Sequence, residues 1–487
     1  MASEHSGVND RSPKAWWVAA GAAAIIVLLA LFAPPLLRPA RPPGGDAPLT
    51  AAPARGNGET SLPPEAGAEG PPGSWWEVPE SPRDATSEAA AALSAHSYLA
   101  GYRPPTGPSG VLMHDAASAQ PGYNLLVSGH APYAALMDND GEVVHEWTLD
   151  PPAGYRVPPQ RRFWRRVLLL DDGELLAIFD PFGIVKLAAD SALLWAMSPD
   201  VHAHHDLVVT DEGLIYVLGK RYRKIPELHE RLTFGEDLVV VIDPADGTTR
   251  HSFSILEAFE NSPYGAEMKE RIRVSAATAP GNGWEDFHAN TIDVFDGSLA
   301  HMSPLFKAGN VISCSPAHNN VFIIDPEAGA VVWNWFGPWR RIHESRVLPG
   351  GRLLLFHNNG YQPDGSARSQ ALEYDLLSRS LLWSYEGTPA DPASHFFSGT
   401  SSTVERLPNG NTLIVVTESG RAIEVTPEHR VVWEFFNPQR AGDHDELIAS
   451  LFQLQRIPAH RVDPWLTAAD APARSPEDRT IPREPAR

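Results

Sequence analysis

One pattern occurs three times near the C-terminal end: EAGAVVW at residues 327–333, SRSLLW at 378–383 and EHRVVW at 428–433. Each copy is a turn followed by a short apolar run and a tryptophan, and the tryptophans are 50 residues apart. A repeat of this length is typical of the four-stranded blades of a β-propeller. We therefore predict that this part of the chain is a series of such blades.

The same pattern occurs three more times toward the N-terminus, as DGEVVHEW ending at Trp147, SALLW ending at Trp195 and DGTTRHSF ending at Phe253. Six copies predict six blades. The intervals of 58 and 80 residues in the middle of the series predict long inserted loops. Because an aromatic residue ends the same strand in each repeat, we interpret these residues as packing between blades rather than as ligand contacts.

A second pattern alternates with the first and consists of two apolar strands around a Gly, Asp or Asn turn, which indicates a hairpin. Its copies are VLLLDDGELLAIF at 167–179, HDLVVTDEGLIYVL at 205–218, HESRVLPGGRLLLF at 343–356 and VERLPNGNTLIVV at 404–416. Together the two patterns supply two hairpins per blade. They predict an all-β, six-bladed propeller over residues 105–465.

An uncharged stretch at 15–37, AWWVAAGAAAIIVLLALFAPPLL, predicts a transmembrane helix. The part before Pro34 spans roughly 28 Å as a helix, close to the thickness of a membrane's hydrocarbon core. Its length and its two boundary tryptophans favour an uncleaved anchor over a signal peptide. The basic residues on the two sides nearly balance, so we take the simpler arrangement, with the short tail inside the cell. The propeller would then be extracytoplasmic, periplasmic or at the cell surface.

The remaining segments have compositions that predict little packed structure. They are an N-terminal tail at 1–14, a Pro-rich disordered linker at 38–83, a short helix and lead-in at 84–104, and a disordered tail at 466–487.

The overall charge and the cysteine content exclude several classes of function. A formal net charge of −21 argues against nucleic-acid binding, which requires a basic face. The single cysteine, Cys314, excludes an internal disulfide and any multi-cysteine metal site. We find no cofactor fingerprint and assign neither a cofactor nor a metal.

Histidine is abundant, with 19 residues, and three histidines occupy related repeat positions. His205 and His343 open the inner strand of the second pattern, and His288 precedes the same position in a divergent fourth blade. That register brings all three toward the central channel. They could form a metal site, a proton-transfer set, or a nucleophile with its acid and base partners. Other histidines in noticeable contexts are His130 in SGHAP and His202 and His204 in HAHHD.

Six stretches together resemble the arylsulfotransferase family, over nearly all of residues 105–460. They are GYNLLVSGHAPYAALMDNDGEVVHEW, HHDLVVTDEG, EDFHANTIDV, NNVFIIDPEAGAVVW, HESRVLPGGRLLLFHNNG and EVTPEHRVVWEFFNP. The resemblance implies a six-bladed propeller that moves a sulfuryl group from a phenolic sulfate ester to a phenol through a sulfohistidine, without a nucleotide donor. It implies His343 as the nucleophile, with His288 and His205 as proton-transfer or oxyanion-stabilising partners.

One position departs from the family. The family has an arginine in the strand before the repeat that here reads VISCSPAHNNVFIID, and Pro316 aligns with it. Proline cannot supply the bidentate cation that holds a sulfate. We consider as substitutes several basic residues near the histidines: Arg340, Arg341, Arg368, Lys220, Arg221, Arg223 and Lys224. We assign Asn290, Arg341 and Arg368 as candidate substrate-binding residues.

Two other hypotheses remain open from the sequence. Because of Pro316, the protein could be a non-catalytic propeller held at the membrane as a binding or scaffold module. The histidine set would also permit a metal- or quinone-dependent oxidoreductase. Some members of the family have an additional N-terminal β-sandwich that aids dimerisation, and the Pro-rich linker here does not support that mode.

Overall fold

The structure is a computed structural model that describes residues 109–157, 162–180, 182–197, 202–277, 283–285, 287–358, 368–387, 394–441 and 447–469. The predicted tail, transmembrane helix, linker and short helix before residue 105 lie outside the described residues. Among the helices that the structure does describe, none is long and apolar enough to cross a membrane.

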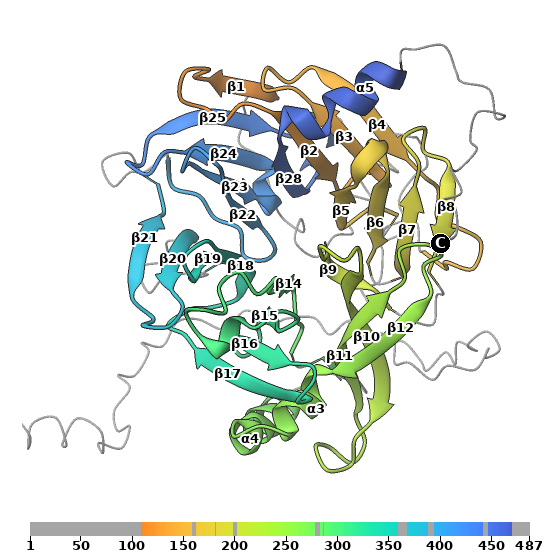
Figure 1. Ribbon diagram of the computed structural model, residues 1–487, viewed down its shortest axis with the longest axis vertical. Helices are drawn as coiled ribbons and strands as arrows, with labels where there is room; N and C mark the ends of the chain where they lie inside the picture. Colours follow the sequence, from red (N-terminus) through yellow and green to blue (C-terminus); the bar gives the residue numbers. More distant parts are fainter. Residues whose placement is uncertain are drawn as a thin grey trace, which may run out of the picture. The chain divides into compact units, whose positions relative to one another are not determined.

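The described residues form six sheets of four or five strands, arranged around a central axis (Figure 1). This arrangement confirms the predicted six-bladed propeller. Blade 1 contains β28 (Leu451–Ile457), β2 (Tyr123–Ser128), β3 (Tyr133–Met137) and β4 (Val143–Thr148); blade 2 contains β5 (Arg166–Leu169), β6 (Leu175–Phe179), β7 (Gly183–Leu187) and β8 (Leu193–Ala196); blade 3 contains β9 (His204–Val209), β10 (Ile215–Lys224), β11 (Thr233–Ile242) and β12 (Thr249–Ser254).

The second half of the ring repeats this order, from the inner strand outward. Blade 4 contains β14 (Thr291–Val294), β15 (Val311–Ser315), β16 (Asn320–Asp325) and β17 (Ala330–Phe336); blade 5 contains β18 (Ile342–Leu348), β19 (Arg352–His357), β20 (Gln370–Asp375) and β21 (Leu381–Tyr385); blade 6 contains β22 (Thr403–Arg406), β23 (Thr412–Val416), β24 (Arg421–Val425), β25 (Val431–Phe436) and β1 (Gly110–His114). A separate short pair is β26 (Arg440–Ala441) with β27 (Leu447–Ile448).

The two ends of the propeller chain close the ring at two places. The late strand β28 is the inner strand of blade 1 and pairs with β2, with Tyr123 opposite Ile457. The early strand β1 pairs with β25 at the outer edge of blade 6, with Gly110 opposite Phe436. Blade 1 and blade 6 therefore each contain one strand from the other end of the propeller chain, held by antiparallel hydrogen bonds.

The burial of each strand explains its pattern of apolar and polar residues in the sequence. The second strand of a blade lies between two neighbouring blades, and the whole of LLAIF at Leu175–Phe179 is buried. Such a strand therefore appears in the sequence as a continuous apolar run. The outer strands alternate more, as in VVHEWT at Val143–Thr148, where Trp147 is buried and its neighbours are more exposed.

The repeated aromatic residues lie on the outer strands and pack between blades, as the sequence predicts. Trp147 Nε1 donates a hydrogen bond to Gly173 O of blade 2, and Trp195 Nε1 donates to Pro244 O of blade 3. Trp433 Nε1 of blade 6 donates to the Asn139 carbonyl of blade 1. Each bond is 2.8–3.1 Å long and runs from one blade to the next. These tryptophans therefore belong to the fold.

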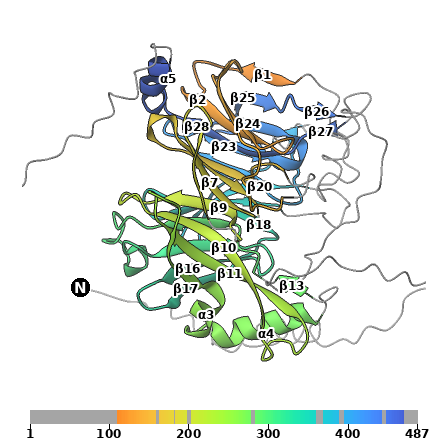
Figure 2. The same cartoon turned by 90° about the vertical axis from the view of Figure 1, so that its right-hand side faces the viewer.

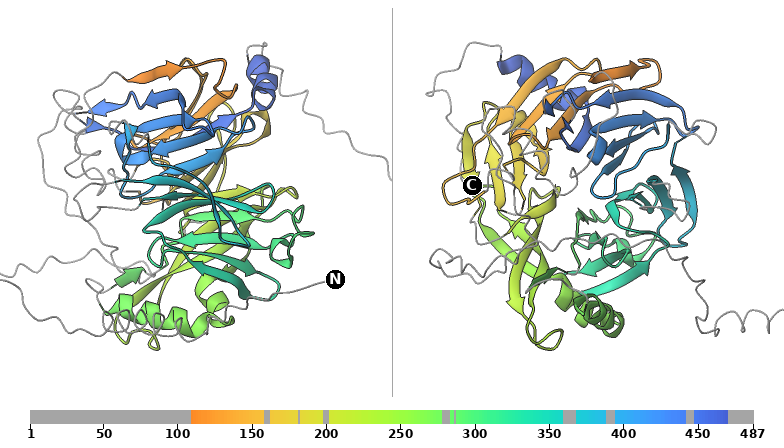
Figure 3. Two further views of the ribbon diagram at one scale, coloured as in Figure 1. Left: turned by 90° about the vertical axis from the view of Figure 1, so that its left-hand side faces the viewer. Right: turned by 180° about the vertical axis from the view of Figure 1, so that it is seen from behind.

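An insertion between blades 3 and 4 accounts for the longest interval in the repeat. It contains α3 (Ile255–Glu260), α4 (Gly265–Ala276) and β13 (Gly283–Glu285), which pairs in parallel with β11. Figures 2 and 3 show both helices at the edge of the ring beside blades 3 and 4. Phe259 of α3 stacks on Phe287, with ring centroids 5.4 Å apart. The insertion therefore fixes the chain next to His288.

The folded part of the chain extends beyond the predicted boundary at residue 465. Helix α5 (Asp463–Ala469) crosses it, and Trp465 packs near Trp147, with ring centroids 6.0 Å apart. Leu466 also packs against this core. The rest of the predicted disordered tail lies outside the described residues.

Candidate active site

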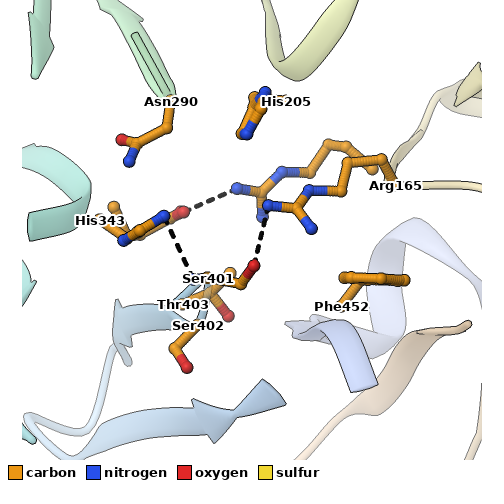
Figure 4. A pocket seen from close by; sticks show the side chains of 10 residues that line it. Arg165, His205, Asn290, His343, Ser401, Ser402, Thr403 and Phe452 are labelled. Atoms are coloured by element: carbon orange, nitrogen blue, oxygen red, sulfur yellow. Dashed lines mark hydrogen bonds and ion pairs between the residues drawn. The ribbon is translucent and has the colours of Figure 1, made fainter. Parts of the chain in front are cut away.

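The three predicted histidines come from the inner strands of three consecutive blades. His205 is on β9, His288 lies just before β14, and His343 is on β18. The rings of His205 and His288 meet edge to face, with centroids 4.8 Å apart. His205 and His343 line one cavity, and Figure 4 shows both side chains directed into it.

The backbone around these histidines has unusual geometry. His205, His288 and Glu344 have φ angles of 55°, 49° and 49°, in the left-handed region. The pairing of β18 with β19 is shifted between His343 and Ser345, which is a bulge. Left-handed non-glycine residues cost about 1–3 kcal/mol each and occur most often at functional sites. Bulges likewise redirect side chains next to active sites.

His343 is held as a neutral imidazole by hydrogen bonds at both ring nitrogens. Its Nδ1 lies 2.7 Å from Asn358 Oδ1 and 3.2 Å from Arg341 O, so these two acceptors place the ring proton on Nδ1. The Nε2 lone pair then accepts a hydrogen bond of 3.2 Å from the backbone N–H of Ser401. Burial lowers the pKa of His343 to about 3. At neutral pH the ring is therefore uncharged, and its Nε2 carries no proton.

Arg165 is the cation of the site, and it was not among the candidates from the sequence. It immediately precedes β5 of blade 2, and its side chain is 10% exposed. Its Nη2 donates to Ser401 Oγ at 2.9 Å, and its guanidinium lies 4.8 Å from the centre of the Phe452 ring. Arg165 therefore brings a positive charge to the cavity, and within the described part of the chain its carboxylate partner is Asp180, at 3.9 Å.

Arg166, the next residue, belongs to a network of four charged side chains beside the cavity. It contacts Asp206 at 3.0 Å and Glu344 at 2.6 Å. Arg346 contacts the same two carboxylates, at 2.7 and 2.9 Å. We call Arg166, Arg346, Asp206 and Glu344 the ion network. The network contains two cations and two anions, and its members Arg166 and Glu344 also line the cavity.

Of the predicted substrate-binding residues, only Asn290 lies at the cavity. Its Nδ2 donates to Ile342 O at 3.0 Å, and its Oδ1 accepts from Cys314 Sγ at 2.9 Å. The Arg341 side chain is exposed and does not line the cavity, although its carbonyl orients His343. Arg368 lies 3.8 Å from Glu386 and is likewise not at the cavity. Arg341 and Arg368 are close to His343 in the sequence, but their side chains do not reach the cavity.

The other basic substitutes do not line the cavity either. Arg221 and Arg223 both pair with Glu236, at 2.6 and 2.7 Å. Arg340 and Lys224 are exposed, and Lys220 is buried with Asp237 at 3.9 Å. Pro316 begins the turn after β15. A sequence signal for Arg165 does exist, because the stretch FWRRV at 163–167 opens an inner strand, as the histidine motifs do.

The histidines do not form a recognisable metal centre. Within the part of the chain that the structure describes, no group of three or more His, Cys, Asp or Glu side chains is arranged to hold a metal ion. The arrangement instead combines a neutral buried imidazole, a cation and backbone and hydroxyl donors. This is a set suited to nucleophilic transfer of an anionic group.

The fold and the site define a six-bladed propeller with a pocket lined by two histidines, His205 and His343. The chain belongs to the arylsulfotransferase (ASST) family, whose model matches residues 167–438. This family assignment confirms the resemblance found in the sequence. No curated protein matches the chain significantly.

The solved structures to which the chain is similar are distant. A protein of unknown function from Bacteroides caccae is 14% identical, with 68% of this chain and 97% of that chain covered and a TM-score of 0.43. The WD40 β-propeller domain of Doa1 is 12% identical, with 72% and 93% covered and a TM-score of 0.37. Virginiamycin B lyase from Staphylococcus aureus is 11% identical, with 70% and 88% covered and a TM-score of 0.37.

Proposed function

We propose that this protein is an aryl-sulfate sulfotransferase that moves a sulfuryl group from a phenolic sulfate ester to a phenol through a sulfohistidine at His343. The observation that carries the proposal is the state of His343: a neutral ring, with its proton on Nδ1 toward Asn358 and its Nε2 at the cavity. A nucleophile oriented and kept unprotonated in this way needs no base to activate it. Membership of the family supports the same chemistry.

In the first step, the Nε2 lone pair of His343 attacks the sulfur of the aryl sulfate. The nitrogen–sulfur bond forms, the bond between sulfur and the phenolic oxygen breaks, and the phenolate leaves with that electron pair. The Ser401 N–H, which donates to Nε2 at 3.2 Å, can turn to a sulfuryl oxygen once the lone pair is used. Backbone donors of this kind stabilise charge that develops in the transition state.

Arg165 takes the role that the family arginine has elsewhere. It lies in the same cavity as His343, and its carboxylate neighbour is 3.9 Å away, so its positive field is directed at the bound anion. Arginine offers a planar set of donors that matches sulfate oxygens. The proline at position 316 therefore does not remove the anion-binding charge, because blade 2 supplies it instead of blade 4.

In the second step, the acceptor phenol attacks the sulfur of sulfo-His343. The new oxygen–sulfur bond forms, the nitrogen–sulfur bond breaks, and the electron pair returns to Nε2. The proton of the phenol must go to a base at or beside the cavity. The candidates are His205, which lines the cavity, and His288, whose ring lies 4.8 Å from that of His205.

The proposal is tested with the full-length protein, 4-nitrophenyl sulfate and a second phenol as acceptor. We expect release of nitrophenolate that depends on the acceptor, and a stable protein-bound sulfuryl group when the acceptor is omitted. His343→Ala should abolish both, whereas His301→Ala, which removes an exposed histidine, should change neither. Absence of release from the folded wild-type protein would instead favour the non-catalytic scaffold.

We propose further that residues 15–37 anchor the protein in a membrane with the propeller outside the cytoplasm. The uncharged run of these residues supports the proposal. Wild-type protein should remain in the membrane fraction until detergent is added, and the propeller should be cut by protease added to intact cells. Leu28→Arg with Leu29→Arg should release the protein, whereas Ala51→Arg with Ala52→Arg in the linker should not. Release of the wild-type protein by salt alone would contradict the anchor.

A further inference from the structure

His204 lies directly behind His205 and contacts it. It is 1% exposed and belongs to the same strand, β9. The Nδ1 atoms of His204 and His205 are 2.9 Å apart. On its other side, His204 Nε2 lies 3.2 Å from Gly219 O and 3.1 Å from Asp237 Oδ1. The two rings and the carboxylate therefore form a continuous chain that ends at the cavity.

The partners of this chain fix where each proton lies. Gly219 O and Asp237 Oδ1 can only accept, so His204 Nε2 carries a hydrogen. With its hydrogen on Nε2, the His204 ring can accept a hydrogen bond at Nδ1, which faces His205. The short distance between the two Nδ1 atoms requires one hydrogen between them, and in this arrangement His205 supplies it. Asp180 Oδ2, 3.4 Å from His205 Nδ1, is a second acceptor for the same hydrogen.

We propose that His204, backed by Asp237, is a positioning residue that holds the hydrogen of His205 on Nδ1 and leaves the Nε2 lone pair of His205 to take the proton of the acceptor phenol. The inference rests on the proposed function and assigns the base of its second step. His204 itself does not touch the substrate. The arrangement is the two-histidine equivalent of a carboxylate that orients a catalytic imidazole.

The proton balance of the step is complete. As the phenol oxygen attacks sulfur, its proton moves to His205 Nε2, and His205 becomes an imidazolium. Its Nδ1 hydrogen still bonds to His204, whose Nε2 hydrogen bonds to Gly219 O with Asp237 Oδ1 3.1 Å away, so the carboxylate stabilises the positive charge through the chain. His343 regains its lone pair. The added proton then leaves with the next departing phenolate or to solvent.

The surroundings of His205 explain why such support is needed. Burial is the main cause that holds the pKa of His205 well below its ordinary value, and the positive charge of Arg165 adds to it. Asp180 Oδ2 lies 3.4 Å from His205 Nδ1, and Asp237 Oδ1 lies 3.1 Å from His204 Nε2. A protonated His205 is therefore costly unless these carboxylates balance its charge, Asp180 directly and Asp237 through His204.

The sharpest test uses two amide substitutions, each of which keeps one of the two hydrogen-bonding groups of His204. In His204→Asn, the side-chain oxygen replaces the Nδ1 acceptor and nothing reaches Asp237. In His204→Gln, the side-chain nitrogen replaces the Nε2 donor and nothing accepts from His205. The state of the His205 ring is measured in the full-length protein labelled with ¹⁵N-histidine, because protonated and unprotonated ring nitrogens give separate signals. The spectrum of His205→Gln identifies the His205 signals.

We expect His205 to carry its hydrogen on Nδ1 in the wild type and in His204→Asn, and to lose this preference in His204→Gln. His301→Asn and His301→Gln, at an exposed histidine, are matched controls that should leave the His205 signals unchanged. An unchanged His205 tautomer in His204→Gln would overturn the inference, and Asp180 would then be the group that orients His205.

The second readout separates the two chemical steps. Formation of sulfo-His343 from 4-nitrophenyl sulfate should proceed at the wild-type rate in both His204 variants. Transfer from sulfo-His343 to the phenol should fall by about 10²-fold in His204→Gln and by less in His204→Asn. Equal losses in both steps would indicate a structural effect and contradict the inference. If the wild type forms no sulfo-His343, the proposed function fails, while the tautomer experiment still decides the role of His204.

Discussion

Three pairs of consecutive residues show how the pocket and the ion network differ. Arg165, His205 and His343 provide the reactive side chains of the pocket, and the residues that follow them, Arg166, Asp206 and Glu344, belong to the ion network. In each pair, the first side chain belongs to the pocket and the next one along the chain belongs to the ion network. Arg166 has two carboxylates within 3.0 Å, whereas Arg165 has one at 3.9 Å.

This difference separates structural charge from functional charge. In the ion network every charge is matched by charges from other blades, so the layer joins blades 2, 3 and 5 and offers little to a ligand. In the pocket the charges are incompletely matched and the histidines are unprotonated. An anionic substrate would complete the pocket, whereas the ion network is already complete.

The largest effect should come from Arg166→Met. Removing this guanidinium leaves Asp206 and Glu344 buried with half of their partners, and breaking a buried ion pair costs about 3–5 kcal/mol of unfolding free energy. Urea denaturation measures it. Arg346→Met should behave similarly, while Arg250→Met, which breaks an exposed pair with Asp243, should change stability by about 1 kcal/mol or less. A small loss in Arg166→Met would show that the ion network is not structural.

Arg165→Met should give the opposite result. We expect a smaller loss of stability than in Arg166→Met, because the carboxylate partner of Arg165 among the described residues is Asp180, at 3.9 Å, and a fall of about 10²–10³-fold in sulfuryl transfer, typical of removing one charge-stabilising donor. Arg165→Lys should recover part of the rate, since it restores the charge without the planar donors. Steady-state kinetics with 4-nitrophenyl sulfate measure both variants. Full activity in Arg165→Met would remove Arg165 from the site.

The pH dependence of stability should show that folding lowers the pKa of His343. The pKa of His343 is about 3 in the folded protein and about 6.5 unfolded, so the unfolded chain binds more protons between these values. Stability should therefore be complete above about pH 6.5 and fall as the pH decreases toward 3. Urea denaturation between pH 4.5 and 7.5 should give a shallower slope for His343→Gln. An identical slope would mean that folding does not lower the pKa of His343.

The smallest effect should come from the outer contacts between blades, which belong neither to the pocket nor to the ion network. Trp195→Phe removes the hydrogen bond to Pro244 O while keeping most of the ring, and should cost about 1 kcal/mol of unfolding free energy. Sulfuryl transfer should be unchanged. A loss of activity at constant stability would show that contacts between blades control the pocket.

Much of the fold follows from local patterns in the sequence. The alternation of hairpins with outer-strand aromatics predicts six blades, and the long interval after Phe253 predicts the insertion that holds α3 and α4. The register of the repeat also predicts that His205, His288 and His343 approach the channel. Closure by β1 and β28 was not predicted, because these pairings join segments more than 300 residues apart and leave no local signal.

The sequence by itself determined which residue types line the channel, because equivalent positions in a repeat occupy equivalent places in space. Only the tertiary structure decided which charges reach the pocket. Arg341 is two residues from His343 yet exposed, whereas Arg165 is 178 residues from His343 and lies in the same cavity. The physical reason is that bulges and left-handed residues set each side chain's direction, and ring closure brings blade 2 opposite blade 5.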